Sequence, residues 1–122
     1  MTKTEALYKF FSSFGIDAYA ASSTPDDVQF PYLTYEATVG AWDSEPVAMT
    51  VQVWYYTESQ SVPDAKAEEI SKAIGLGGVV LPCDDGLTWI TRGSPWCINQ
   101  SDESDKNIKL RQLNVTAEYF TK

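Results

Sequence analysis

The sequence contains no histidine, two cysteines and few basic residues, and each shortage removes a class of function. Without imidazole, Ser-His-Asp and Cys-His nucleophile systems, histidine metal sites and histidine pH switches are excluded. The 9 Lys and Arg residues are outnumbered by 17 Asp and Glu residues, and the formal net charge of -8 opposes broad binding to nucleic-acid phosphates or anionic lipid. We therefore expect a protein that is not an enzyme and has no cofactor, no metal and no membrane partner.

Long hydrophobic runs are also missing. No stretch approaches the roughly 20 apolar residues of a membrane-spanning helix, and the first residues lack the apolar core and cleavage site of a signal peptide. In a chain without export signals, Cys83 and Cys97 are expected to be thiols rather than a disulfide. The 122 residues, 43% of them hydrophobic, are enough for one domain over residues 1–122.

Hydrophobic periodicity predicts two helices and several strands. Apolar residues at three- and four-residue steps predict a helix over residues 3–14, and a second helix is expected from Ser61, as its cap, to Gly75. Alternating or β-branched segments predict strands over residues 16–20, 30–38, 47–56, 79–81, 87–91, 96–98 and 106–120. This order predicts an α+β fold, a two-layer sandwich with a mainly antiparallel sheet and two helices on one face.

Paired carboxylates are candidate catalytic or cation-binding groups. They occur at Asp26-Asp27, Glu68-Glu69 and Asp84-Asp85, but adjacent residues in a turn or helix usually point apart, so solvated acids are expected. The acidic run 102–105 lacks the alternating ligands of a calcium loop and is expected to form a hairpin tip. No catalytic residue follows from these pairs. The enzymatic alternative is a carboxylate-only hydrolase that uses Asp84 and Asp85.

Charge is distributed unevenly along the chain. Residues 1–61 contain 8 acidic and 2 basic side chains, a net charge of -6, whereas residues 62–122 contain 9 and 7, a net charge of -2. On the last strand, Lys106, Lys109 and Arg111 offer a complementary basic patch. This asymmetry predicts head-to-tail self-association, with Lys106, Lys109 and Arg111 at the interface.

The segment 39–46 places a tryptophan beside two carboxylates in a predicted loop. An aromatic residue in such a loop either packs back onto its own sheet or anchors a partner. We count Trp42 among the candidate interface residues and leave both possibilities open.

Several segments together resemble the small tail terminator proteins of long-tailed phages and prophages. These are the N-terminal amphipathic helix that runs into residues 15–19, the strand FPYLTYE at 30–36 and the alternating strand that ends VWYY at 53–56. The helix that begins Val62-Pro63-Asp64, the turn TRGSP at 91–95 and the long closing strand extend the resemblance over nearly the whole chain.

The resemblance implies a virion structural protein at the head-tail interface, assembled in the host cytoplasm. Such proteins form a hexameric ring that ends growth of the tail tube and joins it to head-completion or connector proteins. The expected partners are therefore other copies of this chain, the tail tube protein and those connector proteins. DNA would pass through the ring without specific binding. A lumen that passes DNA should repel phosphate, and Asp26, Asp27, Asp43 and Glu45 are the expected lumen acids.

Two alternatives stay open. A head-tail adaptor or head-completion protein has similar size and chemistry and joins the portal side. A small acidic binding module of the inhibitor type would instead be a monomer that masks a basic partner surface, with steep salt dependence.

Overall fold

A computed structural model describes residues 1–36, 45–84 and 86–121 of the chain. The first helix, α1 (Lys3–Phe11), ends in a 3-10 turn over Ser12–Phe14, so the helical segment has the predicted length but not a uniform geometry. Its N-terminus is closed by a capping box, in which the Glu5 amide donates to Thr2 Oγ1 (3.1 Å) and the Thr2 amide donates to Glu5 Oε1 (3.2 Å). The chain then turns at Gly15, whose φ of 80° suits glycine.

The second helix, α2 (Ser61–Ile74), also lies where the periodicity predicts it, but its cap differs from the prediction. The N-cap residue is Gln60, and its side chain makes no capping hydrogen bond. Ser61 is the first helical residue, and its hydroxyl lies 2.8 Å from the Ser59 hydroxyl. The prediction of Ser61 as the cap is therefore wrong by one residue, because the helical dihedrals begin there.

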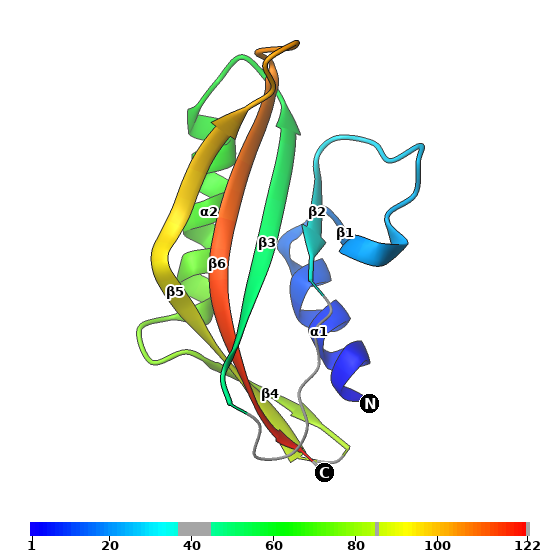
Figure 1. Cartoon of the computed structure of the whole chain (residues 1–122), viewed down its shortest axis with the longest axis vertical. Helices are drawn as coiled ribbons and strands as arrows, with labels where there is room; N and C mark the ends of the chain where they lie inside the picture. The colour runs from blue at the N-terminus through cyan, green and yellow to red at the C-terminus, as the bar shows by residue number, and fades with distance from the viewer. Residues whose placement is uncertain (37–44, 85, 122) are drawn as a thin grey trace.

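Within the described residues, the strands form one six-stranded sheet in the order β1-β2-β3-β6-β5-β4. β1 pairs with β2 in parallel, and the other neighbouring strands are antiparallel. Figure 1 shows this sheet as a long, curled layer. The strands are β1 (Asp17–Ala20), β2 (Tyr32–Tyr35), β3 (Val47–Tyr56), β4 (Val79–Cys83), β5 (Gly86–Ser101) and β6 (Ile108–Thr121).

The strand β5 corrects one sequence prediction. Two strands separated by a turn at 92–95 were expected, but the structure has a single strand over Gly86–Ser101. The neighbouring β6 is long enough to pair with both halves, and a register shift between Arg92 and Cys97 absorbs the extra residues as a bulge. Asn114 of β6 donates from Nδ2 to the Pro95 carbonyl oxygen (2.8 Å), so the bulge remains attached to the sheet.

The core lies between the helices and one face of the sheet. Leu7 and Phe11 of α1 and Ile70 and Ile74 of α2 are almost fully buried in the same cluster as strand residues of that face. The predicted α+β fold, with its mainly antiparallel sheet and helices on one face, is confirmed. The strand members of the cluster include Leu33, Met49, Val51, Val53, Ile90, Leu113, Val115, Ala117 and Tyr119.

Candidate functional site

The face of the sheet opposite α1 and α2, called the uncovered face below, is the feature most suited to binding. Because side chains alternate along a strand, the residues between the core positions all point to this face. The register places them side by side across β2, β3 and β6. They are Tyr32, Thr34, Ala48, Thr50, Gln52, Trp54, Tyr56, Leu110, Gln112, Asn114, Thr116 and Glu118.

An aromatic cluster occupies one end of this face. The rings of Tyr32 and Trp54 stack with centroids 5.9 Å apart and planes 11° apart. Phe30 lies 5.5 Å from Tyr32 and 5.9 Å from Tyr56, so the four rings are contiguous. The side chains of Phe30 and Tyr56 are 40% and 55% exposed, well above the exposure of core aromatics such as Phe11. Exposed aromatic residues of this kind are enriched in protein interfaces.

The middle of the uncovered face is polar but almost uncharged. Amides and hydroxyls at Thr50, Gln52 and Gln112 line a shallow hollow of about 300 Å³, with Glu36 at its margin. The Glu36 carboxylate accepts a hydrogen bond from the Thr50 amide (3.0 Å), which holds it at the end of β2. Interface cores are depleted in charge, and this strip is less charged than a chain with 21% charged residues would provide on average.

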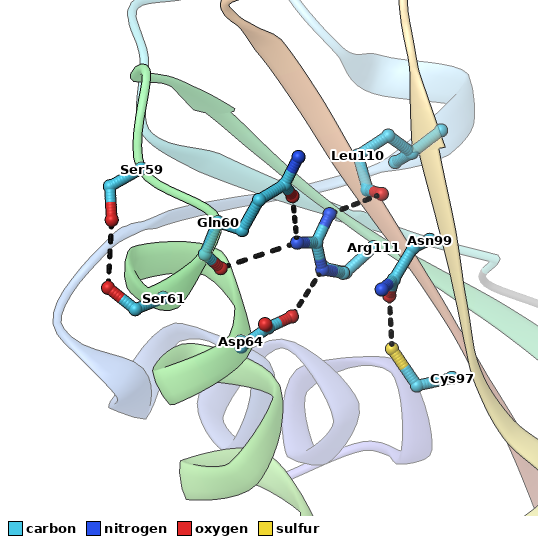
Figure 2. Close-up of polar contacts among 8 residues, drawn as sticks. All are labelled: Ser59, Gln60, Ser61, Asp64, Cys97, Asn99, Leu110 and Arg111. Carbon is cyan, nitrogen blue, oxygen red and sulfur yellow. Dashed lines mark hydrogen bonds and ion pairs between the residues drawn. The ribbon is translucent and has the colours of Figure 1, made fainter.

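A buried arginine links the sheet to the second helix. Arg111 of β6 is 1% exposed and reaches across to the first turn of α2, as Figure 2 shows. Its Nε donates to Asp64 Oδ1 (2.7 Å), and its Nη2 donates to Gln60 Oε1 (2.7 Å). Further donations reach the carbonyl oxygens of Gln60 and Leu110, both at 3.3 Å. This guanidinium on β6 therefore supplies hydrogen-bond donors to the acceptor oxygens at the beginning of α2.

The structure changes the interpretation of the predicted basic patch. Arg111 is enclosed by its partners, and Lys109 is 5% exposed with its ammonium donating to the Lys106 carbonyl oxygen. Lys106 itself is exposed. The alternation of β6 puts positions 109 and 111 on the helix side, so their charges are used inside the fold. Of the three residues, Lys106 alone keeps the surface placement that an interface requires.

The predicted lumen acids are not brought together. Asp26 and Asp27 are exposed in the segment that leads to Phe30, whose ring packs on Tyr56 at the end of β3. Glu45 is exposed just before the start of that strand. These acids therefore lie toward opposite ends of β3, about 30 Å apart at the usual rise per residue. Asp43 and the candidate anchor Trp42 lie outside the described residues.

The other acidic pairs have local structural partners. Asp84 forms an ion pair with the N-terminal ammonium, and Glu69 accepts from Lys66 Nζ at 3.0 Å. At the β5–β6 tip, Asp102 Oδ1 accepts from the Ser104 hydroxyl and amide, and these hydrogen bonds lower the pKa of Asp102. Asp85 lies outside the described residues. Among the described side chains, no three acids or cysteines lie close enough to hold a metal ion.

Cys83 and Cys97 are free and half-buried, and burial raises the pKa of Cys97. In the described part of the chain, neither the length nor the hydropathy of any helix suffices to cross a membrane.

Comparison of the chain with protein-family models, with curated proteins and with solved structures finds no match in any of the three. The resemblance to tail terminators therefore depends on the sequence features alone. The sequence predicts a core or interface position for the aromatic residues but does not locate the uncovered face. The signal was the even-numbered positions of 48–56 and 108–116, none of which is charged and most of which are Thr, Gln, Asn, Trp or Tyr.

Proposed function

We propose that this chain is a structural assembly protein of the tail-terminator type. The single observation that carries the proposal is the uncovered face, which is rich in aromatic, amide and hydroxyl groups and poor in charge. A solvated sheet face normally carries charged side chains, whereas an interface core excludes them. Protein surface is therefore the best complement to this face.

In this proposal the protein is a non-enzymatic virion component of the head-tail interface. It forms a hexameric ring that caps the tail tube, ends its elongation and contacts the head-completion or connector proteins. The lumen repels DNA through acids, with Asp26, Asp27 and Glu45 as the described candidates. A head-tail adaptor built from the same ring is the close alternative.

The area available supports an assembly role. A specific interface takes about 800 Å² from each partner, roughly one eighth of the 6753 Å² surface of this chain. The uncovered face spans β2, β3 and β6, and β3 alone is 10 residues long. A subunit contact of that size would use the uncovered face together with neighbouring surface.

The test is native mass spectrometry over a concentration series at moderate salt, with negative-stain images of the same samples. We expect a closed ring with six-fold symmetry. The variant Gln52→Lys adds a charge to the centre of the uncovered face and should prevent the ring, while Ala65→Lys, on the exposed side of α2, should not. Rings of equal yield from both variants would contradict a role for the uncovered face.

A second candidate function has an observation of its own. The end of the molecule that carries the β5–β6 tip exposes Glu58, Asp102 and Glu103, and the Thr57 amide donates to the Asn107 carbonyl oxygen (2.8 Å), which joins the two acidic segments. An acidic binding module would use this end against a basic protein. A monomer at every concentration, with steep salt dependence of binding to a basic protein, would favour this function over the ring.

A further inference from the structure

The turn after α2 presents the most exposed large apolar side chain among the described residues. Leu76 is 96% exposed, between Gly75 and the Gly77-Gly78 pair. An isolated exposed leucine is ordinary on a protein surface, but this one belongs to a larger patch. Val80 of β4 and Trp89 of β5 pair across the strands, and they are 51% and 37% exposed.

The turn is held rigidly against the sheet. The Trp89 indole Nε1 donates to the Gly77 carbonyl oxygen (3.0 Å), and the Gly78 amide donates to the Gly75 carbonyl oxygen (3.3 Å). Gly78 has a φ of 86°, and an added Cβ there would lie 2.5 Å from Trp89 Nε1 and 2.7 Å from the Ile90 carbonyl oxygen. Leu76 is thus displayed on a preorganised turn, and preorganisation reduces the entropy that binding must overcome.

A complementary hollow lies at the other end of the sheet. Trp54, Ile108 and Leu110 form its apolar floor, and its volume is about 170 Å³. A protein cavity of about 150 Å³ holds a benzene-sized apolar group, so this hollow fits one apolar side chain. Its polar rim consists of Gln100, Ser101 and Asp102.

Trp54, which lines the hollow, has a buried donor atom without a partner among the described residues. This atom is the indole Nε1. A buried donor without an acceptor is costly.

One chain cannot place its own Leu76 in its own hollow. The hollow is at the end of the sheet where α2 begins, because Gln60 contacts Arg111, the neighbour of Leu110. The turn lies after the other end of α2, about 21 Å away along a helix of 14 residues. Figure 1 shows the turn projecting beside the lower part of the sheet, away from the β5–β6 tip at the top.

The charges around the two surfaces are complementary. Lys72 and Arg92 lie near the turn, opposed by Glu118, which pairs with Trp89. The hollow has Asp102 on its rim, with Glu103 next to it on the tip. The acids of the tip, where Asp102, Glu103 and Asp105 outnumber Lys106, are therefore suited to meet Lys72 and Arg92 of the turn.

We propose that Leu76 of one copy inserts into the hollow beside Trp54 of the next copy, which makes a head-to-tail contact. Two different surfaces on one chain generate a heterologous interface, and repetition of such an interface gives a closed ring or an open filament. This inference rests on the proposed function, since it names the contact that builds the ring.

Two variants and a control test the contact. Leu76→Asp removes the inserted group, and Gln100→Trp fills the hollow from its exposed rim. Tyr8→Asp, at a 53% exposed position of α1 outside both surfaces, is the matched control. Circular dichroism and thermal melting check that each variant is folded, and sedimentation velocity with native mass spectrometry reports assembly.

We expect Leu76→Asp and Gln100→Trp each to weaken self-association at least about 30-fold, as loss of a central apolar anchor does. The control should assemble like the unmodified chain. A 1:1 mixture of the two variants should give a dimer and nothing larger, because each variant retains one intact surface and only one productive pairing exists.

Other outcomes overturn the inference and separate it from the proposed function. Rings formed by Leu76→Asp at unchanged concentration would refute the Leu76 contact and leave the proposed function standing. Species larger than a dimer in the mixture would refute the head-to-tail arrangement. An unmodified chain that stays monomeric up to millimolar concentration would refute the Leu76 contact, and capping of tail tubes would then test the terminator role by itself.

Discussion

The two faces of the sheet differ in chemistry although they are made from the same strands. On β6, Leu113 and Val115 point toward the helices and are buried, while their neighbours Gln112 and Asn114 point to the uncovered face and are half-exposed. The first set is apolar, and the second set is polar without charge. Adjacent residues of one strand thus lie in different environments, the apolar core on one side and a partly exposed polar surface on the other.

This division implies that substitutions on the uncovered face can test the proposed assembly without a large loss of stability. The helix face carries the apolar burial that holds the fold together, and the uncovered face contributes little to it. Substitutions on the two faces should therefore affect different measurements, and the predictions below use this separation.

The largest expected effect is on the helix face. Leu113→Ala should lower the free energy of unfolding by about 3 kcal/mol, because it leaves a cavity at a fully buried site. Gln112→Ala, the adjacent residue on the uncovered face, should change it by less than about 0.5 kcal/mol. Urea unfolding of both variants measures the difference. Equal losses would show that the uncovered face is also part of the folding core.

The next largest effect on the free energy of unfolding is expected at Arg111, a buried charged residue on the helix face. Arg111→Ala should cost about 2 to 3 kcal/mol, because Gln60 and Asp64 lose their donor and a cavity remains. Arg111→Met retains most of the volume and removes the buried charge, so we expect a loss below about 1 kcal/mol. Chemical denaturation compares the two variants. An equally large loss with methionine would assign the stability to the hydrogen bonds rather than to packing.

A comparison of Gly15 with Gly78 tests how firmly the turn after α2 is attached to the sheet. Gly15 and Gly78 both have positive φ, but an added Cβ has open space at Gly15 and meets three close atoms at Gly78. Gly15→Ala should therefore cost about 1 kcal/mol from backbone strain alone. Gly78→Ala should cost clearly more, about 2 kcal/mol, and thermal melting measures both. Equal costs would mean that the turn moves freely away from Trp89.

The smallest effect appears only in alkali. Burial raises the pKa of Tyr119 from 10.0 to about 12. The unfolded chain releases this proton near pH 10 and the folded chain retains it, so the contribution of Tyr119 to stability is constant below pH 10 and falls between pH 10 and about 12. Tyr119→Phe should reduce that decline in urea midpoints measured from pH 9 to 12. Some decline should remain, since burial also raises the pKa of Tyr32, Tyr35 and Tyr55.

Local patterns in the sequence were sufficient for most elements. The three- and four-residue spacing of Leu7, Phe11 and Phe14 and the alternation of β3 depend on neighbours in the chain, and both elements lie where they were predicted. The bulged strand β5 was divided in two because Gly93 and Pro95 are turn formers. Pairing with a long neighbouring strand overrides that local preference.

Sequence alone determined the class of fold, the acidic charge and the absence of histidine chemistry, because these depend on composition and on short-range periodicity. Tertiary structure decided which charges are available to a partner. Arg111 and Lys109 resembled surface cations until the pairing of β6 placed them on the helix side. It also decided that Leu76 is exposed on a turn held by Trp89 and that Trp54 lines a hollow at the other end of the sheet. These placements depend on contacts between residues far apart in the chain, which no local pattern specifies.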